Sequence, residues 1–334
     1  MSVELLNFIE TVLNGLMSGV MYSLVALGFV LIFKASGVFN FAQGVFALFA
    51  ALTLVGFQTG QIPFSHLINE LFGTNLHNWY PSLHSFLAIL LTIVTMIILA
   101  WLVERLVLRH LVNQEPIILF MATIGLAFVL EGVGDLMWGS DVKVLDVGIP
   151  SGGSIWLEEA TIGWASEGSE YYGMYIDVLN VWATIIAVIL VTALALFSQY
   201  TKTGRALRAV ADDHQAALSV GISLRSIWIL VWGISGFIAM VAGIMWGTES
   251  GVQFSLSLIA LKALPVLILG GFTSIPGAII GGLLIGVGEK LAEIYIGGLL
   301  DIGAIENWFA YVLALVFLLF RPQGLFGDKI IERV

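Results

Sequence analysis

The sequence predicts an all-α integral membrane protein with about eight transmembrane helices and one short re-entrant or half-span segment. Composition is the first reason, because only 11% of the 334 residues are charged, against about 25% in an ordinary soluble domain. The second reason is a mean hydropathy of +1.01, which leaves too little polar surface to face water. The third is a series of apolar segments close to the roughly 20 residues that cross a bilayer core.

Nine apolar segments account for these helices. The segment at 256–272 is short and contains Lys262 and Pro265, so we expect a half-span or re-entrant piece there. It is joined to the next segment by the Pro- and Gly-containing turn TSIPG. The nine segments cover approximately residues 12–33, 41–57, 86–103, 117–138, 178–197, 227–246, 256–272, 278–296 and 302–320.

The distribution of charge predicts the orientation, because short cytoplasmic loops carry an excess of Lys and Arg. If every segment crosses, the basic residues of 104–116, of 200–225 and of the C-terminal tail share one side. The opposite side holds the loop 139–177, which has seven Asp/Glu against one Lys. We therefore expect the N-terminus outside and the C-terminus inside. The acidic N-terminus is unlike a cleavable signal peptide, so the first span is expected to be retained.

Composition also excludes several classes of function. Cysteine is absent, which rules out disulfides and thiolate metal sites, and no basic patch interleaved with aromatic residues suggests nucleic acid as a partner. His66, His77 and His84 share one outer loop, but their spacing matches no zinc pattern. No phosphate-binding G-x-x-x-x-G-K-[ST] run exists. We therefore expect no catalytic residue, metal or cofactor, and an energy source outside this chain.

The stretch 200–223 is a polar interruption between two apolar segments. It fits two short helices, at about 204–211 and 213–220, with Asp212 and Gln215 as a capping box and Gly221 as the terminating glycine. Small residues, Ala above all, make up its helical stripe. Two interpretations remain open at this point. The stretch is either a connector that lies on its own membrane or a docking helix for a cytoplasmic partner.

The second apolar segment begins with another capping pattern. Asn40 is expected to cap this helix, with Gln43 at its third position. Because the segment is short, its N-terminus could start within the membrane and direct a positive helix end at a substrate carboxylate. The alternative is an ordinary capped helix at the membrane surface.

Small residues spaced by four along several spans predict close helix packing. Ionisable residues within spans are a second unusual feature, and we expect salt bridges, with Lys290 and Glu293 paired locally and Glu131 paired with Lys262. The spaced small residues are Ser235, Ala239, Gly243 and Gly247 on one span, Ala278, Gly282 and Gly286 on another, and Gly15 and Gly19 on the first.

Four motifs carry a resemblance to a known family. AALSVG (residues 216–221) is similar to the Ala-Ala-x-x-x-Gly core of the coupling motif in permease subunits of ABC importers, although Gln215 replaces the usual Glu and the distal part is missing. FNFAQG (39–44), LGGFTSIPGAIIGG (269–282) and RPQGLFG (321–327) resemble permeases of branched-chain amino acid importers. The similarity runs from Asn14 to Gly327, except for the outer loop 139–177.

This resemblance implies roles for particular residues. A coupling loop at 200–225 would contact an ATP-binding subunit, and the close contact would come from Ala216, Ala217 and Gly221. The residues assigned to coupling are Arg205, Arg208, Asp212, Gln215, Ala216, Ala217 and Gly221. Those assigned to the translocation pathway are Asn40, Gln43, Thr273 and Ser274. Those assigned to helix packing or to a permease–permease interface are Ser235, Ala239, Gly243, Gly282 and Gly286.

The resemblance further implies one transmembrane permease domain, 1–334, in the bacterial inner membrane. Its partners would be two ABC ATP-binding subunits, a second related permease, a periplasmic substrate-binding protein and membrane lipid. Branched-chain amino acids are the expected substrates, with urea or short amides as an alternative. An ion-coupled secondary transporter is the alternative from another class, and Glu131 is its best candidate for a coupling carboxylate.

Overall fold

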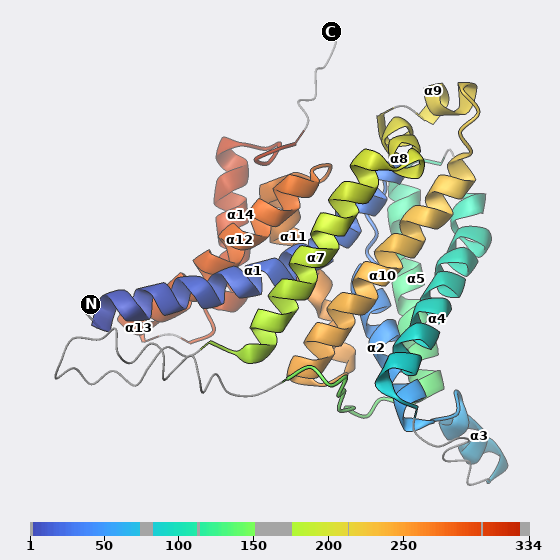
Figure 1. Ribbon diagram of the computed structural model, residues 1–334, viewed down its shortest axis with the longest axis horizontal. Helices are drawn as coiled ribbons and strands as arrows, with labels where there is room; N and C mark the ends of the chain where they lie inside the picture. The colour runs from blue at the N-terminus through green and yellow to red at the C-terminus, as the bar shows by residue number, and fades with distance from the viewer. Residues whose placement is uncertain are drawn as a thin grey trace. The chain divides into compact units, whose positions relative to one another are not determined.

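The computed structural model describes residues 3–73, 83–111, 114–150, 176–212, 214–301 and 303–327. Within these residues the chain is a set of helices and connectors (Figure 1). It also contains one isolated antiparallel bridge, between Lys143 and Val252. Most of the loop expected at 139–177 lies outside the described residues. Its proposed role as an outer connection therefore stays a prediction.

Among the described residues, six helices are long and apolar enough to cross a membrane. The longest is α1, whose 34 residues correspond to about 51 Å at 1.5 Å per residue. Three shorter apolar helical stretches account for the remaining expected segments. The main helices are α1 (Val3–Ser36), α2 (Gln43–Thr59), α3 (Ser65–Phe72), α4 (Ser85–Leu106), α5 (Pro116–Trp138), α7 (Val178–Tyr200), α8 (Lys202–Asp212), α9 (His214–Ser219), α10 (Leu224–Ser250), α11 (Ile259–Gly270), α12 (Ile275–Leu291) and α14 (Glu306–Phe320).

Short elements complete the described chain. The 3-10 helix η2 (Phe254–Leu258) leads into α11, and the two together form the apolar stretch in which the sequence predicted a half-span. Another 3-10 turn, η1 (Leu108–His110), follows α4. A π-helical stretch, η3 (Ala292–Gly297), and α13 (Gly298–Leu300) extend α12. All nine apolar segments are thus helical, and six of them reach spanning length.

The chain divides into two compact units that alternate along the sequence. Unit 1 contains 1–26, 149–192 and 262–334, and unit 2 contains 27–148 and 193–261. In unit 2, α10 packs along α2 and α4, and α2 also contacts α5. Within this unit α8 and α9 lie at one end, whereas α3 lies at the other (Figure 1). The distribution of charge predicts that the stretch 200–223 and the outer loop that contains α3 lie on opposite sides of the membrane, and this placement agrees with that prediction.

Glycine allows helices within unit 2 to approach at backbone distance. A side-chain Cβ at Gly243 would overlap the backbone of Ala47, and one at Gly44 would overlap the carbonyl of Ser257. Beside these contacts, the rings of Phe46 and Trp232 pack edge to face at 5.8 Å. With the glycine contacts and the packed rings together, α2 is buried along most of its length.

Glycine also allows α1 and α12 to pack at backbone distance in unit 1. A Cβ at Gly286 would overlap the backbone of Gly15 and Gly19, and one at Gly282 would overlap Gly19 and Ser23. Ser23 donates a hydrogen bond to the carbonyl of Gly19 at 2.8 Å, and its oxygen lies 3.2 Å from the carbonyl of Ile279. The four-residue spacing seen in the sequence therefore corresponds to a real packing face.

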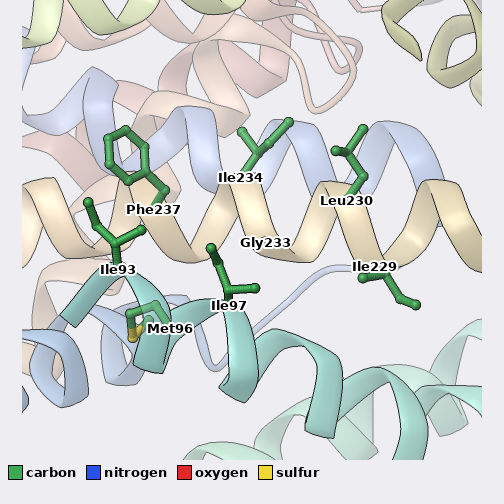
Figure 2. Close-up of a pocket in the computed structure, with 8 residues that line it drawn as sticks. All are labelled: Ile93, Met96, Ile97, Ile229, Leu230, Gly233, Ile234 and Phe237. Carbon is green, nitrogen blue, oxygen red and sulfur yellow. The ribbon is translucent and has the colours of Figure 1, made fainter. Parts of the chain in front are cut away.

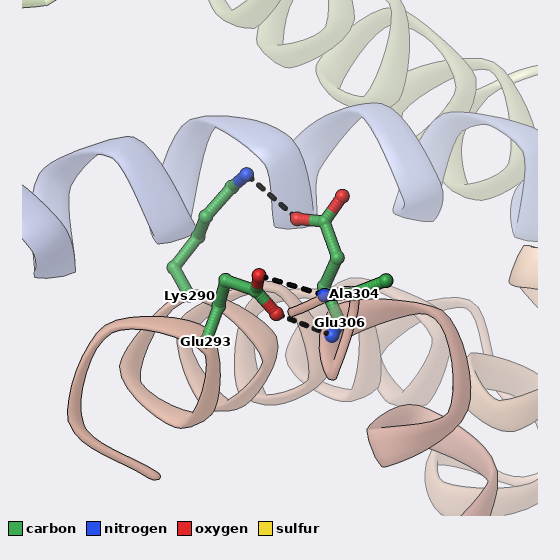
Figure 3. A network of polar contacts seen from close by, with 4 residues as sticks. All are labelled: Lys290, Glu293, Ala304 and Glu306. Carbon is green, nitrogen blue, oxygen red and sulfur yellow. Dashed lines mark hydrogen bonds and ion pairs between the residues drawn. The ribbon is translucent and has the colours of Figure 1, made fainter. Parts of the chain in front are cut away.

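The expected local pair of Lys290 and Glu293 is wrong. Lys290 instead forms an ion pair with Glu306 at 2.9 Å, across to the start of α14 (Figure 3). Glu293 accepts hydrogen bonds from the backbone N–H groups of Ala304, at 3.1 Å, and Glu306, at 3.0 Å. A carboxylate near the first turn of a helix is favourable because it satisfies unpaired amides. Lys290 therefore pairs with Glu306, which tertiary packing brings beside it, and not with Glu293, which lies three residues further along the chain.

Replacing Gly286 with Val tests the glycine face. Because the backbone of α1 has no room to give, we expect Gly286→Val to lower stability by about 2 kcal/mol or more, measured as a lower melting temperature in detergent. Gly132→Val is the matched control, because a Cβ at Gly132 meets nothing within 4 Å. Equal melting temperatures for the two variants would contradict this packing.

Candidate functional site

The polar interruption forms two helices, as the sequence predicted. The first helix, α8, buries Leu207 and Val210 on one face. The second helix, α9, is shorter than expected because it begins at His214 and ends at Ser219. Asp212 is the last residue of α8 instead of the cap of α9, and Gln215 is the second residue of α9. Residue 213 lies outside the described residues.

Gly221 ends α9 in the way the sequence predicted. Its φ of +83° lies in the left-handed region, which side chains with a Cβ adopt only with strain. The N–H of Ile222 donates to the carbonyl of Ala217, and that of Gly221 donates to the carbonyl of Leu218, both at 3.0 Å. These two bonds are the Schellman pattern that closes a helix C-terminus.

The exposed surface of α9 differs from the one expected. Ala217 is only 2% exposed and faces the protein, so it is not available to a partner. Ala216 and Gly221 are exposed, and beside them Leu218 is 53% and Val220 74% exposed. Neither side chain was among the predicted contact residues, because the close contact was assigned to the small residues Ala216, Ala217 and Gly221. Two exposed aliphatic residues on a polar connector provide a small apolar contact surface.

Arg205 and Arg208, which were expected near this surface, lie in different environments. Arg205 is exposed on α8. Arg208 is partly exposed and donates a long hydrogen bond, 3.4 Å, to the carbonyl of Gln199. Arg208 thus helps fix the junction between α7 and α8, whereas Arg205 remains directed to solvent.

An ion pair connects the start of α10 to α4. Arg225 Nε lies 3.5 Å from Glu104 Oε1, and the Glu104 side chain is almost fully buried. Both α8 and α9 contact α10. The α8–α9 connector therefore contacts a helix that is itself tied to α4 by this ion pair.

The start of α2 is buried in unit 2. The helix begins at Gln43, two residues later than expected, and the side chain of Asn40 does not cap it in the predicted manner. Instead Asn40 accepts from the N–H of Ala42 at 3.1 Å and donates to Gln43 Oε1 at 3.3 Å. Ser235 on α10 donates to the same Gln43 oxygen at 2.8 Å. These residues form a closed polar cluster in which Asn40, Gln43 and Ser235 are at most 1% exposed.

The depth of this cluster favours a helix that starts within the membrane. Ser235 lies about 17 Å along α10 from Leu224, and α10 has 27 residues, or about 40 Å. The connector ahead of α2 is also fixed from α5, where the Thr123 hydroxyl oxygen accepts from the N–H of Phe41 at 3.1 Å. Non-helical backbone at such depth is tolerated only where protein covers it, and buried side chains provide that cover here.

Thr273 and Ser274 occupy the loop between α11 and α12. Ser274 caps α12, because its hydroxyl accepts from the N–H of Gly277 at 3.0 Å. The RPQGLFG motif pairs with the end of α11, just before this loop. The N–H of Leu325 donates to the carbonyl of Leu269, at 2.8 Å, and the N–H of Phe326 donates to that of Gly270, at 3.1 Å. Two motifs that lie far apart in the sequence therefore form one structural unit. Ser274 has a local structural role whether or not substrate passes nearby.

The residues assigned to packing or to an interface are used inside the chain. Ser235, Ala239 and Gly243 are buried among the helices of unit 2. Gly282 and Gly286 are covered by α1 in unit 1. These positions therefore favour helix packing over a surface offered to a second permease. Among the residues that the structure describes, no group of His, Asp and Glu could hold a metal ion.

Comparison with known proteins agrees with this arrangement. A family model described as branched-chain amino acid transport system / permease component matches residues 11–321. The chain belongs to this permease family. It is 28% identical to the high-affinity branched-chain amino acid transport system permease protein LivH of Escherichia coli K12, over the full length of both chains. BraD of Pseudomonas aeruginosa is 26% identical, with 99% of each chain covered.

The similarity extends to an archaeal protein. The probable branched-chain amino acid transport permease LivH of Methanocaldococcus jannaschii is 28% identical, covering 91% of this chain and 88% of its own. Full-length coverage means that the permease fold, rather than one shared segment, is common to these proteins. The chain is therefore a multi-pass membrane permease, as the four motifs indicated.

Gln43 is the residue on which the polar cluster depends. Replacing it with Leu removes the acceptor of the buried Asn40 amide and leaves the Ser235 hydroxyl only the carbonyl of Gly28, 3.1 Å away. A buried polar group that loses its partner costs about 1–3 kcal/mol. We expect Gln43→Leu to lower the melting temperature by several degrees and to reduce transport. Gln58→Leu is the control, because Gln58 makes its hydrogen bonds at the more exposed end of α2. Similar losses in both variants would argue against a special role for the cluster.

Proposed function

We propose that this permease is the membrane subunit of an ABC importer that carries branched-chain or related hydrophobic amino acids across the bacterial inner membrane. ATP hydrolysis would take place in two separate ATP-binding subunits. A second related permease and a periplasmic substrate-binding protein would complete the complex. The substrate class rests on the names of the relatives, whereas the coupling to ATP rests on the geometry of α9.

The observation that carries the coupling is the compact, exposed end of the α8–α9 connector. Leu218 and Val220 are exposed there, and Ala216 and Gly221 lie beside them without bulky side chains. A short helix with this surface can enter a groove on a partner, where apolar burial contributes about 25 cal/mol per Å². The excess of Lys and Arg in the neighbouring loops favours the cytoplasmic side for this surface, where ATP would be available.

The route from α9 to the transport pathway passes through α10. Gly221 and Ser223 connect α9 directly to α10, and Ser223 caps α10 by accepting from the N–H of Ser226. Displacement of α9 by a bound ATP-binding subunit would therefore shift α10. Because Ser235 on α10 is hydrogen-bonded to Gln43, that shift would act on the start of α2. The buried start of α2 would then open and close as access alternates between the two sides.

An amino acid substrate fits the start of α2. The N-terminus of a helix carries a partial positive charge, which favours a carboxylate. In discontinuous transporter helices such ends bind the substrate carboxylate near the bilayer midplane. Asn40 and Gln43 would supply hydrogen bonds once the cluster opens. Thr273 and Ser274 remain candidates for the pathway, although Ser274 already serves as a helix cap.

Gly221→Val tests the coupling role. A Val at a φ of +83° strains the backbone by about 1–3 kcal/mol, which should deform the end of α9. We expect ATP-driven uptake by the reconstituted complex to fall at least about tenfold, with normal membrane insertion. Gly148→Val is the matched control, since Gly148 has a φ of +79° and equally open surroundings, but lies within the loop 139–177 that is expected on the outer side. Uptake that survives Gly221→Val would exclude this coupling mechanism.

Crosslinking identifies the partner directly. The chain has no cysteine, so Leu218→Cys introduces a single thiol on the exposed face of α9. We expect a bifunctional thiol–amine reagent to link it to an ATP-binding subunit. Val144→Cys, at a position that is 86% exposed on the expected outer side, should give no such product. Uptake that needs no ATP-binding subunits and stops with ionophores would instead favour a secondary transporter.

A further inference from the structure

A groove between α4 and α10 is not used by the proposed transport mechanism. Its volume is about 390 Å³, and its walls come entirely from apolar residues (Figure 2). Gly233 forms the floor in the middle, where an added Cβ would meet nothing within 4 Å. The lining residues are Ile93, Met96, Ile97, Ile229, Leu230, Gly233, Ile234 and Phe237.

Beyond the groove, the same faces of α4 and α10 lead to basic residues. On α4, the groove residues Ile93 and Ile97 are followed at the same four-residue spacing by Trp101 and Arg105. On α10, Arg225 precedes Ile229, Gly233 and Phe237 at the same spacing. Residues four apart lie on the same face of a helix. Each wall therefore runs from an apolar stripe to an arginine.

The basic end has the composition of a membrane interface. The Arg105 guanidinium lies 5.0 Å from the centre of the Trp101 ring, and Trp101 is exposed. The Arg225 side chain is 51% exposed, although its Nε also contacts the buried Glu104. With Glu104 counted, this end carries a net charge of about +1. Tryptophan and arginine are the residues that anchor helices at the headgroup level.

The length of the groove together with its basic end favours a phospholipid as the bound molecule. From Ile93 to Arg105, and from Arg225 to Phe237, the rise is about 18 Å along each helix. Half of the roughly 30 Å hydrocarbon core is about 15 Å, so the groove and its basic end are one leaflet deep. A helix of a second permease would need apolar contact across the whole core. A phospholipid needs one leaflet of apolar surface and a charged contact at the interface.

We propose that the α4–α10 groove binds an anionic phospholipid, with an acyl chain over Gly233 and the phosphate of its headgroup beside Arg105 and Arg225. Basic pockets between transmembrane helices at the cytoplasmic side suit such headgroups. Because Arg225 also holds Glu104, the bound lipid would stabilise the junction between α10 and α4. This site is independent of the assignment of α9 to an ATP-binding subunit.

Native mass spectrometry of the purified full chain tests the acyl part of the site. Equal amounts of phosphatidylglycerol and phosphatidylcholine are added as probes, and retained lipid is measured. We expect Gly233→Leu, which fills the groove, to lower retained phosphatidylglycerol at least about fivefold. Gly132→Leu is the matched control on α5, where the added side chain also meets open space, and it should retain lipid as the unaltered chain does. If Gly233→Leu does not fold, Ile97→Phe fills the same groove from α4.

The headgroup part is tested by charge. Arg105→Gln, and separately the charge-balanced pair Glu104→Gln with Arg225→Gln, should bring the ratio of phosphatidylglycerol to phosphatidylcholine close to one. Equal lipid retention by Gly233→Leu and Gly132→Leu would overturn the proposal, as would an unchanged ratio in the arginine variants. Stabilisation by inorganic phosphate alone, equal to that by phosphatidylglycerol, would also overturn it. Crosslinks from Gly233→Cys to a second permease, formed in phospholipid membranes, would overturn the proposal as well.

Discussion

Close approach of helix backbones through glycine is the constraint on which this permease depends. Lipid is as apolar as the side chains, so burial of apolar surface does not hold transmembrane helices together as it does in water. Dispersion contacts and hydrogen bonds must do so, and both need short distances. Gly282 and Gly286 provide this approach in unit 1, and Gly44 and Gly243 provide it in unit 2. A Cβ at any of these positions would overlap a neighbouring backbone.

The same closeness makes the polar cluster at the start of α2 possible. Gln43 can reach Ser235 because α2 and α10 pack without intervening side chains at Gly243. Low polarity around the cluster strengthens its hydrogen bonds and makes an unpaired member costly. The cluster therefore stabilises one arrangement of α2 and α10 when all partners are present. A small shift of α10 would break several bonds together, which is the behaviour required of a gate.

Different parts of α10 enter the proposed mechanism. The helix contacts α8 and α9, Arg225 in its first turn pairs with Glu104, and Ser235 lies at the level of the groove beside α4, whose α10 residues run from Ile229 to Phe237. A lipid in that groove would contact the helix that the coupling segment is proposed to move. Lipid composition could then influence transport without any contact with substrate. In this view α10 is the element that integrates the coupling helix, the gate and the bilayer.

The sequence by itself determined the fold class, the nine apolar segments, the glycine faces and the glycine that ends α9. These features follow from composition, spacing and backbone conformation, which are properties of short stretches. Tertiary structure decided the rest. Lys290 pairs with Glu306 instead of Glu293, Ala217 faces inward while Leu218 and Val220 are exposed, and Gln43 bonds to a helix almost 200 residues away. Such choices depend on which helices become neighbours, and residue spacing within one segment carries no information about them.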